Sequence, residues 1–337
     1  MSSLINVLDK ISEQINIILG IAFFVLGMIG NFCNILVFSP ILKTKLFPSS
    51  PSRLYILIGS IADFIYVLYL LSTRILISAF FIPVTNTSPF MCKTRFYIGQ
   101  VCTYASLYTT CFATIDQYCL TSRSVKIRQL SRLSLARKIL YPLIIFWILI
   151  NIPELFLYDV YPTANGKSTV CTVYSPIWDF YFTYIQSLIL HCIIPLVLLI
   201  VFGLLIKHNL STVRQLHPSI IRQMTRMILF QALAMAISLF VITTNTIYQQ
   251  VTQNISRDSL RSSQENLFYT IARLFSFVNY MVSFYIYLYS SKSLRKNFKN
   301  VLLNRPIDST THTTGHQPIV QTRMDQVRPT ALDYNQQ

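Results

Sequence analysis

Charged residues, acidic residues and glycine are all scarce in this sequence. Asp, Glu, Lys and Arg together make up 12% of the 337 residues, whereas a soluble globular domain averages about 25%. This deficit excludes an ordinary cytosolic protein. The eight glycines form no phosphate-cradling loop, and the sequence holds neither a Gly-x-Ser-x-Gly motif nor a cluster with metal-ligand spacing. We therefore expect that the chain is not an enzyme.

Apolar residues make up 53% of the chain and gather into runs that carry almost no charge. A helix needs about 20 such residues to cross the hydrocarbon core of a bilayer. Asp63 and Glu154 are the two acidic residues inside the runs. Seven runs qualify: 14–42, 54–73, 96–115, 139–158, 180–206, 227–256 and 274–291. The sequence thus predicts an all-α membrane protein, a seven-transmembrane helix bundle.

Basic residues predict how this bundle is oriented. The net charge is +16, and most Lys and Arg lie in one alternate set of connections and in the C-terminal segment. Because Lys and Arg accumulate in cytoplasmic loops, we expect the N-terminus outside the cell and the C-terminus inside. The predicted divisions are an extracellular N-terminus at 1–14, the bundle at 15–305 and a disordered cytoplasmic tail at 306–337. Topology accounts for the positive charge, so we expect no nucleic-acid partner.

A short amphipathic helix is expected directly after the seventh span. Apolar and basic residues alternate there at helical spacing, which suits a helix lying on the inner membrane surface with its cations over anionic lipid. The apolar members are Leu294, Phe298, Val301 and Leu302, and the basic ones are Lys292, Arg295, Lys296 and Lys299.

Two of the seven cysteines fall on the predicted outer side. Cys92 precedes the third span and Cys171 precedes the fifth, and a disulfide between them would tie that loop to the third helix. The other five are expected to be small buried hydrophobic residues. Asn86 and Asn254 begin Asn-x-Ser/Thr sequences on the same side and are the predicted glycosylation sites.

Polar residues inside the spans are expensive in lipid and therefore face the bundle interior. Steps of three or four residues place five members of the seventh span on one helical face: Arg273, Ser276, Asn279, Ser283 and Tyr287. We expect Asn31, Asp63 and Ser106 to meet this stripe and to form a hydrated polar centre.

Several short motifs follow one another over these spans. They are Gly30-Asn31, the segment ending at Asp63, Cys92 with Cys171, Asp116-Gln117-Tyr118, Trp147, Pro195 and Ser283-Phe284-Tyr285-Ile286-Tyr287. Their order and spacing over 15–305 resemble the rhodopsin-like (class A) G-protein-coupled receptors. The resemblance implies a multi-pass plasma-membrane receptor for an extracellular ligand, with a heterotrimeric G protein as partner. It also implies arrestin binding to the tail after phosphorylation of its Ser and Thr residues.

The resemblance further implies roles for two groups of residues. Asp63, Ser106, Asn279 and Ser283 resemble the family's sodium pocket, so an allosteric sodium ion is the cofactor to consider. Asp116, Gln117, Tyr118 and Tyr287 resemble the residues of the family's switch and G-protein coupling.

Three departures from the family pattern bear on signalling. Gln117 stands where the family has Arg and offers no charge. Residues 219–256 contain neither Trp nor Pro, and Ser283-Phe284 replaces Asn-Pro, so the seventh helix should be straighter than usual. Pro195 should kink or bulge the fifth helix.

These departures leave two alternatives open. One is a receptor that binds its ligand without signalling. The other is a transporter or channel, although we find none of the repeated halves that are common in transporters.

The ligand class is narrowed by exclusion. Gly99 occupies the position of the Asp that binds amines in related receptors, and 266–291 holds no Lys for retinal. What remains is a peptide, such as a neuropeptide, or another non-amine ligand. The predicted ligand-binding residues are Gln100, Thr103, Tyr104, Tyr184, His191 and Arg273.

Arg273 is the strongest charge of this set. It would anchor an anionic group such as a peptide carboxylate. The alternative is an internal ion pair of Arg273 with Glu154, Asp179 or Glu265, and His191 could equally be a core residue.

Overall fold

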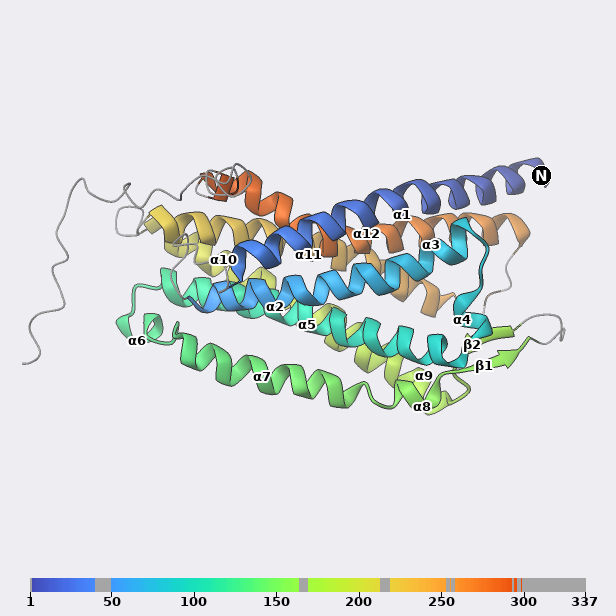
Figure 1. Cartoon of the computed structure of the whole chain (residues 1–337), viewed down its shortest axis with the longest axis horizontal. Helices are drawn as coiled ribbons and strands as arrows, with labels where there is room; N and C mark the ends of the chain where they lie inside the picture. The colour runs from blue at the N-terminus through green and yellow to red at the C-terminus, as the bar shows by residue number, and fades with distance from the viewer. Residues whose placement is uncertain are drawn as a thin grey trace, which may run out of the picture.

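The computed structural model is a bundle of long helices with one short β-hairpin at one end (Figure 1). Seven helical rods lie side by side in the described part of the chain, which confirms the predicted fold class. The structure describes residues 2–39, 50–163, 169–212, 219–252 and 258–292, together with 255, 294, 295 and 298.

Each rod corresponds to one of the uncharged spans in the sequence. Five are single helices: α1 Ser2–Phe38, α5 Pro89–Thr121, α7 Leu133–Ile150, α11 Ser219–Val251 and α12 Ser259–Ser290. The second rod joins α2 Pro51–Tyr66, the π-helical η1 Val67–Leu71 and α3 Ser72–Ala79. The fifth joins α9 Pro176–Phe180, the π-helical η2 Tyr181–Ile193 and α10 Ile194–Thr212. Short elements connect the rods: α4 Val84–Thr87, α6 Val125–Arg128, α8 Glu154–Leu157, β1 Asp159–Pro162 and β2 Thr169–Thr172.

Six of these rods are apolar enough over their length to cross a membrane, and α5 is not among the helices that meet this criterion within the described residues. The position of α5 explains why it is less apolar than the other rods. It contacts α2, α7, α10 and α11. A helix enclosed by other helices needs no continuous lipid-facing surface and can carry more polar side chains.

A serine followed by a proline begins three of the rods. The Ser50, Ser88 and Ser175 hydroxyls accept hydrogen bonds from the backbone N–H groups of Arg53, Met91 and Trp178. Proline then occupies the first helical position, where its missing N–H costs no helical bond. Local sequence chemistry thus fixes where these rods start.

The fifth rod is irregular where proline predicted it. The π-helix η2 ends just before Pro195, and the Ile194 N–H donates to the Ile189 carbonyl five residues earlier. This wider turn takes up the bond and the space that Pro195 removes. The π-helix η1 in the second rod has no proline and was not foreseen. As expected from Ser283-Phe284, α12 continues without interruption through this position.

The first rod starts far earlier than the uncharged run does. Because α1 begins at Ser2, the predicted boundary between an N-terminal segment and the bundle at residue 15 falls within this helix. The Ser12 hydroxyl donates to the Thr270 hydroxyl over 3.0 Å, so these first turns also pack on α12. Charge counting located the apolar part of the helix and missed the polar turns that extend it.

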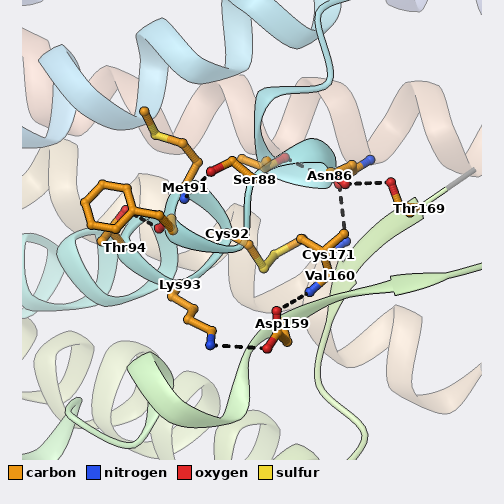
Figure 2. The surroundings of a disulfide bond; sticks show 12 residues. Asn86, Ser88, Met91, Cys92, Lys93, Thr94, Asp159, Val160, Thr169 and Cys171 are labelled. Carbon is orange, nitrogen blue, oxygen red and sulfur yellow. Dashed lines mark hydrogen bonds and ion pairs between the residues drawn. A yellow bond between two sulfur atoms is a disulfide. The ribbon is translucent and has the colours of Figure 1, made fainter.

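The hairpin and a disulfide close one end of the bundle, which we call the hairpin end (Figure 2). Cys92 at the start of α5 is bonded to Cys171 of β2, as predicted. Cys171 N also donates to Asn86 Oδ1 over 3.2 Å. The Val160 N–H and the Lys93 ammonium, whose Nζ lies 3.2 Å from Asp159 Oδ2, hold the pKa of Asp159 below its usual range. The carboxylate therefore keeps its charge and its place near neutral pH.

The two ends of the bundle are distinguished by the elements that lie there. The amino end lies at the hairpin end, and α6 marks the opposite end, the α6 end (Figure 1). After α12, Leu294 is buried while Lys292 and Arg295 are exposed, which is the amphipathic pattern expected there. The predicted glycosylation site Asn254 and the predicted tail at 306–337 lie outside the described residues.

Replacing both Cys92 and Cys171 by serine should lower the thermal unfolding midpoint of the purified protein. The bond closes a loop of 79 residues, which in the chain-entropy account is worth up to about 4 kcal/mol. The matched control is Cys33→Ala, which removes a half-buried free cysteine. Equal midpoints for the double variant and the parent would contradict a stabilising role for this bond.

Candidate ligand cavity and polar network

A cavity of about 530 Å³ opens among the helices toward the hairpin end. Its walls come from α3, α5, η2, α11 and α12. The volume lies in the range of roughly 300–1,000 Å³ that is common for small-ligand sites. Four of the six predicted ligand-binding residues line it, namely Gln100, Thr103, His191 and Arg273.

The other two predicted ligand-binding residues do not line this cavity. Tyr104 is buried, its ring stacks on Trp147 with centroids 4.3 Å apart, and its hydroxyl donates to the Gln186 carbonyl. Tyr184 is exposed and lies against Phe180. Tyr104 follows Thr103 by one position, which turns it about 100° around the helix and into the core. The structure therefore corrects the placement of both tyrosines.

Arg273 faces the cavity and rests on an aromatic ring. Its guanidinium carbon lies 5.8 Å from the centroid of Tyr269, one turn earlier on α12. Such a contact holds a cation in place and leaves its charge uncompensated. Arg273 is exposed to the cavity rather than packed away.

The alternative for Arg273, an internal ion pair, is not formed among the described residues. Glu265 Oε1 instead accepts from Arg261 Nε over 2.8 Å. Glu154 is fully buried, with its Oε1 3.4 Å from Gln186 Nε2. The side chain of the third candidate partner, Asp179, is not among those that the structure describes. Within the described residues, Arg273 has no salt bridge.

Two further arginines line the same cavity, and the sequence did not single them out. Arg74 of α3 donates from Nε and Nη2 to Asn16 Oδ1, over 3.1 and 2.8 Å. Arg95 of α5 donates from Nε to Thr73 Oγ1 over 2.9 Å. A signal was present for Arg95, since eleven residues, about three helical turns, separate it from Ser106 on α5 and place both on one face. The same count does not hold for Arg74, because the π-helical η1 lies between it and Asp63.

The four residues of the predicted sodium pocket lie near one another below the large cavity. Asp63 is buried, accepts a hydrogen bond from the Ser106 hydroxyl and, with Ser283, lines a second small cavity. Asn279 lies one turn before Ser283 and lines the large cavity. The Ser283 hydroxyl accepts from Asn34 Nδ2 over 3.0 Å.

Two buried oxygens in this region suit a cation. Asp63 Oδ1 and Asn279 Oδ1 have no hydrogen-bond partner among the described residues. A carboxylate with hydroxyl and amide oxygens is the donor set that hard cations prefer. These residues thus fit sodium. The part of the chain that the structure describes holds no cluster of three or more His, Cys, Asp or Glu side chains for a transition metal.

A polar network joins three rods near the α6 end. Gln117 of α5 is fully buried, donates from Nε2 to the Ser52 hydroxyl over 2.7 Å and accepts at Oε1 from the Thr225 hydroxyl over 2.6 Å. Ser52 in turn donates to Asp116, which also accepts from the Ser131 hydroxyl. The network thus connects α2, α5 and α11 without using a basic side chain.

The remaining two predicted switch residues pack against apolar neighbours. Tyr118 contacts Phe202 of α10 edge to face, with centroids 5.4 Å apart. Tyr287 is buried and meets Phe38 edge to face at 6.0 Å. Ser52 and Thr225 were missed because both lie just outside the predicted spans 54–73 and 227–256, where a hydroxyl has no sequence signature of its own.

Sodium should raise the thermal unfolding midpoint of the purified chain, and Asp63→Asn should abolish this effect. The substitution removes the one formal negative charge from the predicted ion site, so the remaining oxygens bind a cation far more weakly. The measurement compares sodium chloride with choline chloride at equal ionic strength. Asp9→Asn, at an exposed position on α1, is the control. An unchanged sodium response in Asp63→Asn would discard the ion-site assignment.

Comparison with known proteins matches this arrangement to one family. Residues 33–287 match the model of the family described as 7 transmembrane receptor (rhodopsin family). A comparison with curated proteins finds none that matches the chain. Members of the matched family are plasma-membrane signalling receptors rather than enzymes, transporters or channels. Because the match spans most of the sequence, from the end of α1 into α12, the chain belongs to the rhodopsin family of seven-transmembrane receptors.

Proposed function

We propose that this receptor binds a peptide or another non-amine ligand in the large cavity, from outside the cell, and activates a heterotrimeric G protein at the α6 end. The observation that carries this proposal is the position of α5. Its outer half lines the cavity through Gln100 and Thr103, and its inner half holds Gln117 in the polar network. One helix in contact with four other rods therefore connects the two sites.

The proposed orientation rests on charge and redox chemistry. Exposed basic residues follow α5 and α12 toward the α6 end, where topology places cytoplasmic loops. The disulfide lies at the hairpin end and is favoured by the oxidising exterior. Both arguments support a cavity that opens outside the cell.

A non-amine ligand follows from the cavity wall. No Asp or Glu is among the residues that line the described cavity, so an ammonium group finds no counter-ion there. At Gly99 a Cβ would lie 2.8 Å from Leu70 Cδ2, so an acidic side chain here would require the Leu70 side chain to shift.

Activation by this route would part the inner ends of α10 and α11 from α5. The Thr225–Gln117 hydrogen bond opposes that movement. Between neutral groups, such a bond contributes about 0.5–1.5 kcal/mol, roughly half of what a charged partner gives. The inactive form is therefore held by a weak hydrogen bond between Thr225 and Gln117, which we call the latch.

Screening a peptide library on cells that express the chain tests the proposal, with second messenger and arrestin recruitment measured together. A peptide that raises both signals supports it. The variant Gln100→Trp places a larger side chain in the cavity and should abolish the response without loss of surface expression. Ligand binding without agonist-dependent nucleotide exchange on the G protein would instead support the non-signalling alternative.

Replacing Thr225 by valine should raise ligand-independent nucleotide exchange severalfold. Valine keeps the shape of threonine but cannot donate to Gln117 Oε1, so the bond of about 1 kcal/mol that holds α11 to α5 is lost. Thr246→Val is the control, since this hydroxyl bonds a carbonyl of its own helix. Equal basal exchange in Thr225→Val and the parent would argue against the latch.

Replacing Gln117 by arginine should raise agonist-dependent nucleotide exchange if the missing charge limits coupling. An arginine at this position would lie beside Asp116 and could offer a cation to the G protein. Equal signalling by both forms would reject the missing arginine as the cause of weak coupling.

A further inference from the structure

We infer that the cavity binds a ligand end with two anionic groups, such as the two carboxylates of an acidic peptide terminus, through Arg74, Arg95 and Arg273. The inference rests on the proposed function for the side from which the ligand arrives. It adds the chemistry that the site recognises.

The charge of the cavity wall is the first argument. Three guanidinium groups from α3, α5 and α12 line one cavity, and among the residues that the structure describes no carboxylate lines it with them. The charge of Arg273 repels those of Arg74 and Arg95. Like charges that share a partly desolvated space destabilise the empty receptor, and an anion placed among them relieves that repulsion.

The partners of the arginines are the second argument. Asn16 orients Arg74, Thr73 orients Arg95 and the Tyr269 ring supports Arg273. All three partners are neutral, so the side chains are held in position with their charges intact. A guanidinium has five N–H donors in a planar fork, and these contacts use only some of them. The cations are therefore preorganised for an acceptor from outside the protein.

The number of arginines sets the number of anionic groups. A carboxylate has two oxygens and can bind one guanidinium side by side or two guanidiniums with one oxygen each. A single carboxylate would leave an excess of two positive charges in the cavity. A second anionic group reduces this excess to one and engages the third arginine.

A buried amide oxygen in the wall favours a peptide end over a bare inorganic anion. Asn245 Oδ1 is buried and lacks a hydrogen-bond donor among the described residues, and Asn245 lines the cavity. A peptide N–H group next to the acidic groups would satisfy it. The volume of about 530 Å³ admits the last residues of a peptide, while the rest of the peptide stays outside.

The test measures the thermal unfolding midpoint of the full chain in phosphatidylcholine nanodiscs, at constant ionic strength. Three probes of nearly equal shape carry two, one and no negative charges: acetyl-Gly-Asp, acetyl-Gly-Asn and acetyl-Gly-Asn-amide. We expect acetyl-Gly-Asp to stabilise the receptor at a concentration about tenfold lower than acetyl-Gly-Asn, which corresponds to one further charged contact. The neutral probe should give no shift.

Arginine variants then locate the binding site. Arg273→Gln, Arg74→Gln and Arg95→Gln should each raise the half-effective concentration of acetyl-Gly-Asp about tenfold or more. Arg261→Gln is the matched control, since Arg261 lies on the same helix as Arg273 but does not line the cavity. Where a glutamine variant fails to fold, the lysine variant keeps the charge and should bind acetyl-Gly-Asp with intermediate strength.

The inference is overturned by equal stabilisation with the neutral probe, by equal stabilisation with choline chloride, or by an unchanged response in Arg273→Gln. If the soluble probes have no effect in phosphatidylcholine nanodiscs, the inference fails as well. The proposed function fails separately. If acetyl-Gly-Asp binds but no library peptide promotes nucleotide exchange, signalling fails and the anion site stands. If a peptide without acidic groups activates both the parent and Arg273→Gln, signalling stands and the anion site fails.

Discussion

The absence of water from the bilayer core is the constraint on which this structure depends. A polar side chain that faces hydrocarbon loses its hydrogen bonds, so the few polar residues of the rods must find partners inside the bundle. Many serines and threonines do so locally, as when Thr114 and Thr243 donate to the carbonyl four residues earlier. Larger polar groups cannot be satisfied in this way. They gather instead in the large cavity, around Asp63 and in the network at Gln117.

The central helix α5 carries most of this polar content because its neighbours shield it from lipid. Its polar face presents Gln100 and Thr103 to the cavity, Ser106 to Asp63 and Gln117 to the inner network. Between these levels, the stack of Tyr104 on Trp147 fixes α5 against α7. A rigid helix that takes part in all three polar regions can transmit a small displacement from one end to the other, provided that a partner rod has two arrangements to choose between.

The sequence predicted those features of the fold that depend on single residues rather than on contacts between distant ones. Charged residues in lipid are costly, so uncharged runs located every rod, and Pro195 located the irregular part of the fifth. Helix ends were less accurate, because capping by Ser50, Ser88 and Ser175 extends the rods into polar sequence. Pairings across the chain were not accessible: Thr225 lies 108 positions from Gln117, and nothing local marks either residue as the other's partner.

The site predictions divide along the same line. The periodicity of α12 placed Arg273, Asn279 and Ser283 on one face, and the structure places all three on cavity walls. Arg74 and Arg95 were not singled out, since the sequence does not distinguish them from basic residues in loops, and the structure places them on the cavity wall beside Asn16 and Thr73. Tyr104 shows the opposite error, because a polar tip on a long aromatic ring is as well satisfied by a core carbonyl as by a ligand.

The two ends of the bundle differ in how they use charge, and this difference constrains activation. The hairpin end keeps three cations without an acidic neighbour in the cavity wall, while the inner network replaces an expected cation with the neutral amide of Gln117. A ligand shifts a conformational equilibrium only by the difference between its affinities for the two forms. A neutral latch worth about 1 kcal/mol needs a correspondingly small difference, and rearranging one charged contact among the arginines is enough to supply it. Under the proposed function, strong electrostatics at the hairpin end and weak hydrogen bonding at the α6 end would be complementary features of one switch.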